Sequence, residues 1–198
     1  MTFEKIILAS KSPRRSQLLQ WAEIKFDVIT ADTDESYPKN FPPHEVAIHI
    51  AVNKAMDVKK GLRSPGTNGD DYPILAADTI VVLDNKIIGK PSDRAEAINT
   101  LLLLSGVMHR VVTGVCILSA GKKIVFAEET EVEFNALSKK HIEYYVDNYK
   151  PYDKAGAYAI QEWIGVTGIK SIKGDFYNVM GLPVSRIVKE LKGLKILY

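Results

Sequence analysis

Two serines and two arginines mark the start of a predicted helix at residues 10–15, Ser-Lys-Ser-Pro-Arg-Arg. Ser12 suits the N-cap of a helix, and Pro13 suits the first helical position. Arg14 and Arg15 follow in the first turn, where the helix dipole is already positive and each extra cation costs about 0.3–1 kcal/mol. Free backbone amides, hydroxyls and guanidinium groups together suit a phosphate chain, so the pattern predicts an anion site. A solvated basic helix start is the alternative.

Asp78 interrupts an apolar, β-branched run at residues 74–83 that predicts a largely buried strand. A buried carboxylate without a partner is costly, so Asp78 must be paired, metal-bound or protonated. These requirements make it a candidate general base or metal ligand. A structural carboxylate bonded to backbone amides at a strand irregularity is the alternative.

Two more charged residues are candidates for the same chemistry. Glu35 lies in an acidic loop at residues 31–36. Mg²⁺ prefers carboxylate oxygens and water as ligands, although a merely solvated loop would carry the same residues. Lys54 falls on the apolar stripe of a helix predicted for residues 42–60. Its amine either reaches water along the helix surface or points into a cleft between two lobes and meets a phosphate.

Lys90 and Gln161 complete the candidates that the residues themselves suggest. A turn at Asp84-Asn85 predicts a hairpin, which would bring Lys90 back toward the Asp78 end of the neighbouring strand. Gln161 ends a stretch rich in small residues at positions 153–161. Its amide carries both a donor and an acceptor, which suits the recognition of a nucleobase edge. A hydrogen bond to nearby backbone is the alternative role.

Six motifs, taken in order, resemble those of the Maf family of nucleoside triphosphate pyrophosphatases, and together they cover nearly the whole chain. They occupy residues 8–15, 76–79, 89–91, 109–114, 153–161 and 174–183. The resemblance implies an α/β fold with an elongated mixed β-sheet flanked by helices and two lobes around a central cleft, similar to inosine triphosphate pyrophosphatases. It implies an enzyme that cleaves between the α- and β-phosphates and needs a divalent metal, Mg²⁺ or Mn²⁺. The products would be a nucleoside monophosphate and pyrophosphate.

The resemblance also implies a role for each matching residue. Asp78 would be the proton acceptor, and Glu35 and Asp78 would hold the metal. The residues associated with a preference for dTTP and UTP are Arg14, Thr79 and Gln161. Those that line the phosphate and metal end are Ser10, Arg15, Glu35, Lys54 and Lys90. A sister group that acts on 7-methyl-GTP carries a bulky residue where Arg14 stands, so Arg14 favours the pyrimidine branch.

Three features depart from the family pattern. Lys11 replaces a small residue, the loop at residues 61–73 is longer than expected, and Gln161 is followed by Glu162-Trp163-Ile164-Gly165 instead of a glycine-rich stretch. The substrate therefore stays open among dTTP and UTP, modified pyrimidine nucleotides and 7-methyl-GTP. A regulatory protein that binds a nucleotide without turnover is the alternative from another class.

The elements that must position these residues follow from periodicity. Strands are predicted at residues 6–9, 26–29, 74–83, 86–88, 107–118 and 123–134. Helices are predicted at residues 13–22, 42–60, 92–105, 138–149 and 183–192, with Ser92 and Ser138 as N-caps and a turn at residues 174–178. We expect one Maf-like domain of two lobes over residues 1–198, with a flexible loop or insertion at residues 61–73.

Composition narrows the class of protein. The chain has 198 residues, 46% of them hydrophobic and 25% charged, and a net charge of +2. This charge gives no reason to expect nucleic-acid or membrane partners. A single cysteine excludes an intrachain disulfide, and we see neither a secretory signal nor a run of about 20 apolar residues. We therefore expect a cytoplasmic protein with a nucleoside triphosphate as its partner, and a homodimer stays open.

Overall fold

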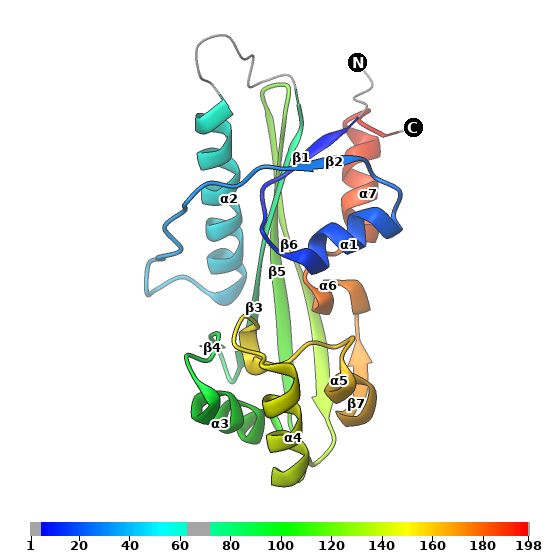
Figure 1. Ribbon diagram of the computed structural model, residues 1–198. Helices are drawn as coiled ribbons and strands as arrows, with labels where there is room; N and C mark the ends of the chain where they lie inside the picture. Colours follow the sequence, from blue (N-terminus) through cyan, green and yellow to red (C-terminus); the bar gives the residue numbers. More distant parts are fainter. Residues whose placement is uncertain (1–4, 63–71, 198) are drawn as a thin grey trace. The chain divides into compact units, whose positions relative to one another are not determined.

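The structure is a computed structural model that describes residues 5–62 and 72–197 (Figure 1). Its strands are β1 (Ile6–Leu8), β2 (Phe26–Val28), β3 (Ile74–Leu83), β4 (Lys86–Ile88), β5 (Met108–Ser119), β6 (Lys122–Phe134) and β7 (Ile169–Lys173). Its helices are α1 (Pro13–Trp21), α2 (Pro43–Leu62), α3 (Arg94–Leu104), α4 (Lys139–Tyr149), α5 (Trp163–Gly168), α6 (Phe176–Met180) and α7 (Val184–Gly193), with a 3₁₀ turn, η1, at Ala155–Ala157.

Within the described residues the strands form a seven-stranded sheet of mixed orientation. The strand order is β2-β1-β3-β5-β6-β7, and β4 pairs with β3 away from this path. Strand β1 pairs in parallel with β2 and β3, whereas β4 and β7 pair antiparallel with β3 and β6. This confirms the expected α/β class with a mixed sheet and flanking helices.

The chain divides into two compact units, and β3, β5 and β6 contribute residues to each. The first unit comprises residues 1–78, 113–128 and 181–198, and it includes β1, β2, α1, α2 and α7. Figure 1 shows α2 on one side of the strands of this unit and α1 and α7 on the other.

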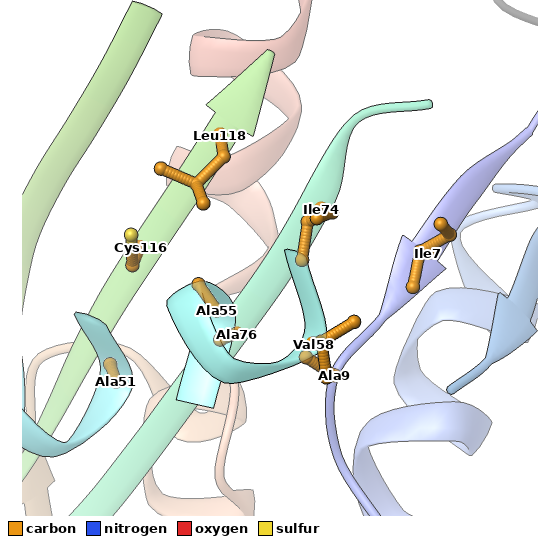
Figure 2. Close-up of a cluster of buried hydrophobic side chains, with 9 residues drawn as sticks. All are labelled: Ile7, Ala9, Ala51, Ala55, Val58, Ile74, Ala76, Cys116 and Leu118. Carbon is orange, nitrogen blue, oxygen red and sulfur yellow. The ribbon is translucent and has the colours of Figure 1, made fainter. Parts of the chain in front are cut away.

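The core of the first unit lies between α2 and the sheet. Figure 2 shows its side chains, which come from α2 (Ala51, Ala55, Val58), β1 and the residue after it (Ile7, Ala9), β3 (Ile74, Ala76) and β5 (Cys116, Leu118). Each strand contributes every second residue because strand side chains alternate between the two faces. The intervening Leu8, Leu75 and Ile117 are fully buried, so these strands are covered on both faces.

Gly114 of β5 allows α2 to lie close to the sheet. A β-carbon at this position would stand 2.2 Å from the carbonyl carbon of Ala47 in α2. Because the obstructing atoms belong to the helix backbone, a larger residue would push α2 away from the sheet. Gly114 therefore sets the distance between the strand and the helix that carries Lys54.

The second unit comprises residues 79–112 and 129–180. Its β3–β4 hairpin turns at Asp84 and Asn85, which both have positive φ (47° and 65°), as a two-residue hairpin turn requires. Helices α3 and α4 pack together, and the Arg94 guanidinium binds the Asp147 carboxylate through two hydrogen bonds of 2.6 and 2.9 Å. The buried His109 ring accompanies Phe134 and Tyr158 in the interior of this unit.

Most predicted helices and strands are confirmed, with four corrections. Helix α3 is capped by Asp93, whose side chain accepts from the Glu96 amide, while Ser92 donates to the Glu96 carboxylate. Residues 176–180 form α6 where a turn was expected, and α5 and β7 were not predicted. Leu102, expected on the apolar face of α3, is 42% exposed.

The predicted loop at residues 61–73 falls mostly outside the described residues, and its first two residues belong to α2. No helix in the described part of the chain is long and apolar enough to cross a membrane.

Candidate functional site

Asp78 and Lys54 form the centre of the candidate site, in the first unit. Asp78 stands two residues beyond Ala76 in β3, so its side chain is on the face of the sheet that α2 covers. Lys54 stands one turn before Val58 in α2, on the stripe that packs against this face. The Lys54 Nζ lies 2.7 Å from the Asp78 Oδ1, and the two side chains are only 18% and 14% exposed. The pairing explains how β3 accommodates a carboxylate in an apolar run.

Glu35 converges on the same cation. Its Oε1 also lies 2.7 Å from the Lys54 Nζ, and its side chain is half exposed at the edge of the cluster. Lys54 therefore bridges two carboxylates that come from different parts of the chain. The Lys54 side chain is thus largely buried and paired with carboxylates, and its contact with a phosphate stays a prediction.

Arg15 is buried, and its guanidinium joins three segments of the first unit. Its Nε donates to the Gly181 carbonyl at 2.8 Å, and its Nη1 donates to the Ser10 hydroxyl at 3.0 Å. Gly181 has φ of +121°, a conformation that favours glycine, so its carbonyl can be presented to Arg15. The Ser10 hydroxyl also accepts from the Ser12 amide at 3.2 Å.

The charges at this site influence one another. Burial lowers the pKa of the Arg15 guanidinium, chiefly by desolvation, while the negative charges of Asp78 and Glu35 oppose that shift and Arg14 adds to it. These four residues are thus electrostatic neighbours. The first turn of α1 and the cluster around Lys54 consequently belong to one charged region of the first unit.

The start of α1 matches the sequence prediction in its main features. Ser12 is the N-cap and Pro13 the first helical residue, but the Ser12 hydroxyl makes no capping hydrogen bond. The Arg14 side chain is half-buried, and Lys11 is exposed. The first turn contains no acidic residue, so nothing in α1 itself balances the positive end of the helix dipole.

A metal ion at this site would have few protein ligands. Among residues 5–62 and 72–197 there is no group of three or more His, Cys, Asp or Glu side chains placed to hold one. Mg²⁺ often takes only one or two protein carboxylates and completes its shell with water and substrate phosphates. Glu35 and Asp78, which both pair with the Lys54 ammonium, are two carboxylates of this kind.

The other three predicted site residues belong to the second unit. Thr79 follows Asp78 in β3 and is half-buried, whereas Lys90 and Gln161 are both exposed. Lys90 and the stretch before Gln161 are tied together, because the Gly156 amide donates to the Gly89 carbonyl at 3.1 Å. The structure thus joins six of the predicted residues in one unit and three in the other.

Sequence reasoning missed the residues that position the site. Gly114 and Gly181 lie inside motifs that were noted, but their partners, Ala47 and Arg15, are far away in sequence. The only local indication of their role was that each glycine stands in an otherwise apolar or turn-forming stretch. Nothing in the sequence indicated which backbone each of them would meet.

A family model described as "Maf-like protein" matches residues 5–194. A dTTP/UTP pyrophosphatase of Parabacteroides distasonis is 48% identical over 189 residues, 95% of each chain. Proteins of the same name from Bacteroides thetaiotaomicron and Cytophaga hutchinsonii are 46% and 48% identical, and the matches span 96% and 83% of their lengths.

The solved structures include a more distant likeness. The Ham1 protein of Staphylococcus aureus aligns with a TM-score of 0.44 and 15% identity, over 66% of this chain and 71% of that one.

Proposed function

The chain belongs to the Maf family, and from that premise we propose that it hydrolyses dTTP and UTP to the nucleoside monophosphate and pyrophosphate. The relatives named dTTP/UTP pyrophosphatase match nearly the whole chain at 46–48% identity. The observation that carries the proposal is the charged cluster of the first unit. There a strand carboxylate, Asp78, is paired with Lys54 beside the Arg15 and Ser10 end of α1.

Asp78 is the proposed general base. Its carboxylate orients or deprotonates the water that attacks the α-phosphorus, and pyrophosphate leaves. Lys54 holds the Asp78 carboxylate in place at 2.7 Å, so the base is positioned before substrate arrives. A base of this kind typically contributes about 10²–10⁴-fold to the rate.

The cations of the same unit neutralise the triphosphate. Lys54 and Arg14 supply charge, and the buried Arg15 holds Ser10 and the Gly181 carbonyl so that the first turn of α1 keeps its shape. Such prearranged charge is the main means by which a protein stabilises phosphoryl transfer. Lys90, Thr79 and Gln161 are assigned to substrate recognition because they match the family motifs.

We also propose that Glu35 and Asp78 hold a divalent cation, Mg²⁺ or Mn²⁺. When bound, the cation supplies positive charge to the phosphate oxygens. The two carboxylates lie close together, since each has an oxygen 2.7 Å from the Lys54 Nζ. The cytoplasmic location stays a prediction.

A nucleotide panel tests the proposed reaction. The purified chain is incubated with dTTP, UTP, CTP, GTP, ATP and 7-methyl-GTP in Mg²⁺ or Mn²⁺, and monophosphate and pyrophosphate are measured together. We expect equal amounts of both products, formed fastest from dTTP and UTP. Binding without turnover would instead support a regulatory protein, and a preference for 7-methyl-GTP would overturn the substrate assignment.

A second experiment tests the position of attack. Hydrolysis of UTP in heavy-oxygen water should place the label in UMP, because the water attacks the α-phosphorus. Label in pyrophosphate would show attack at the β-phosphorus and would contradict the proposed role of the Asp78-bound water.

A further inference from the structure

We propose that Tyr145 is a positioning residue for nucleotide selection, because its hydroxyl closes a clamp around the turn that presents Gln161. This inference rests on the proposed function, in which Gln161 contacts the nucleobase. Glu162 and Lys154 complete the clamp. All four residues lie in the second unit.

Gln161 occupies a tight turn whose ends are hydrogen-bonded to each other. The Glu162 amide donates to the Ala159 carbonyl at 3.1 Å, which leaves Ile160 and Gln161 as the two central residues. Ile160 is only 3% exposed, whereas Gln161 is exposed. The turn therefore anchors itself through Ile160 and presents the Gln161 side chain outward.

The Tyr145 hydroxyl contacts both ends of this turn. It accepts from the Ala159 amide at 3.3 Å and donates to the Glu162 Oε2. Tyr145 itself is fully buried in α4 and stacks on Tyr149, with ring centroids 4.9 Å apart, so the hydroxyl is held by a rigid element. The result is a closed ring of hydrogen bonds through Tyr145, Glu162 and Ala159.

Lys154 holds the other side of the Glu162 carboxylate. Its Nζ lies 3.5 Å from the Glu162 Oε1 and 2.8 Å from the Asp153 Oδ1, and its side chain is only 9% exposed. Close packing adds a further restraint, since a β-carbon at Gly165 would stand 1.8 Å from the Ile160 carbonyl oxygen. The backbone on both sides of Gln161 is thus fixed from three directions.

This restraint has a consequence for selectivity. A side chain that must recognise a base edge loses less conformational freedom on binding when its backbone is already fixed. Discrimination through hydrogen bonds also requires donors and acceptors at defined positions. Glu162 begins the segment that differs from the glycine-rich family pattern. In the proposed clamp, this residue accepts the hydrogen bond from Tyr145.

The variant Tyr145→Phe removes the hydroxyl and keeps the buried ring. We expect KM for dTTP and UTP to rise by about three- to tenfold, with kcat little changed. A factor of this size corresponds to weakening one hydrogen bond between Gln161 and the base. The preference for these nucleotides over CTP should fall. Tyr149→Phe, which alters a neighbouring ring outside the clamp, is the matched control and should keep wild-type KM values.

Two further measurements separate positioning from a purely structural role. In a Gln161→Ala background, adding Tyr145→Phe should raise KM no further, because the group that the clamp positions is gone. Hydrogen exchange of the Ala159 and Glu162 amides should accelerate in Tyr145→Phe but not in Tyr149→Phe. Unchanged KM and preference, with only a lower melting temperature, would overturn the proposal.

Failure of the proposed function would be recognised separately. Wild-type protein that releases no pyrophosphate from any nucleotide would refute the proposed reaction, whatever the variants do. Hydrogen exchange then decides the clamp alone: faster exchange in Tyr145→Phe would support it, and unchanged exchange would overturn it.

Discussion

Lys54 of α2 and Asp78 of β3 form an ion pair in which Nζ lies 2.7 Å from Oδ1. The pair follows from the side-chain period of the strand and that of the helix. Every second residue of β3 faces α2, and Lys54 lies on the stripe of α2 that faces β3. A second carboxylate, Glu35, reaches the same amine at 2.7 Å. The lysine thus compensates a carboxylate that the apolar strand could not otherwise accommodate.

Lys54→Met should lower both stability and turnover. The change leaves the largely buried Asp78 carboxylate without this partner, which should cost about 2 kcal/mol in the free energy of unfolding. Turnover of UTP should fall at least about 100-fold because a positioned cation is lost. Denaturant unfolding and pyrophosphate release measure the two effects.

Lys60→Met is the matched control for this change. Lys60 pairs with Asp57 on the same helix, but its side chain is 73% exposed. Its loss should change stability by less than about 1 kcal/mol and leave turnover intact. Equal effects of the two substitutions would show that the Lys54 pair has no special role.

Arg14 and Arg15 should have different effects on substrate choice. Arg15 is buried and bound to Ser10 and Gly181, so Arg15→Ala should destabilise the chain and lower turnover of all nucleotides alike. Arg14 is only half-buried, and Arg14→Ala should change the ratio of UTP to GTP turnover more. Steady-state kinetics with both nucleotides provide the comparison. A uniform loss in Arg14→Ala would reduce this residue to a phosphate contact.

Gly114→Ala should disrupt the packing of α2 on the sheet. The new β-carbon would stand 2.2 Å from helix backbone, and overpacking of this kind costs about 1–3 kcal/mol. Displacement of α2 should also weaken the Lys54–Asp78 pair and with it UTP turnover. Gly193→Ala, whose β-carbon meets nothing within 4 Å, is the control and should melt at the wild-type temperature or higher. Comparable melting temperatures for both variants would contradict the packing argument.

His109 should make stability depend on pH. Burial lowers the pKa of His109 from 6.5 to about 4. Between pH 6.5 and 4 His109 is protonated in the unfolded chain but neutral in the folded chain. The free energy of unfolding is therefore unaffected by His109 above pH 6.5 and falls as the pH drops toward 4. The loss attributable to this residue should be about 3 kcal/mol.

His109→Gln tests this assignment. Glutamine can still hydrogen-bond the Tyr158 hydroxyl, which lies 2.7 Å from the His109 Nε2, but it does not titrate. The variant should therefore lose less stability than the wild type between pH 6.5 and 4, as measured by denaturant unfolding. His44→Gln, at an exposed position, should keep the wild-type slope. A slope unchanged in His109→Gln would assign the acid sensitivity to other groups.

The sequence predicted individual site residues better than their contacts. Asp78 stood out because a charge in an apolar strand needs a partner, and Lys54 because a charge lay on an apolar helix stripe. Their pairing is a property of the fold, since 24 positions separate them. The Arg15 bond to the Gly181 carbonyl spans 166 positions, and no local pattern encodes it.

The elements that escaped prediction are short and have weak local signals. Helix α5 has only six residues, of which Gly165 and Gly168 are poor helix formers. Its formation depends on tertiary packing, because Gly168 lies against Leu137 and Phe134. At the start of α3, Ser92 and Asp93 are both good caps, and only the hydrogen bonds with Glu96 decide between them.

The most direct test is pyrophosphate release from UTP by Asp78→Asn in the presence of Mg²⁺. Asparagine keeps the size of the side chain and can still accept from Lys54, but it cannot act as a base. Asp57→Asn, which removes a carboxylate from an ion pair within α2, is the control for the change of charge. Turnover should fall at least about 100-fold in Asp78→Asn and stay within twofold of wild type in the control. Near wild-type turnover by a folded Asp78→Asn protein would contradict the assignment of this carboxylate as the base.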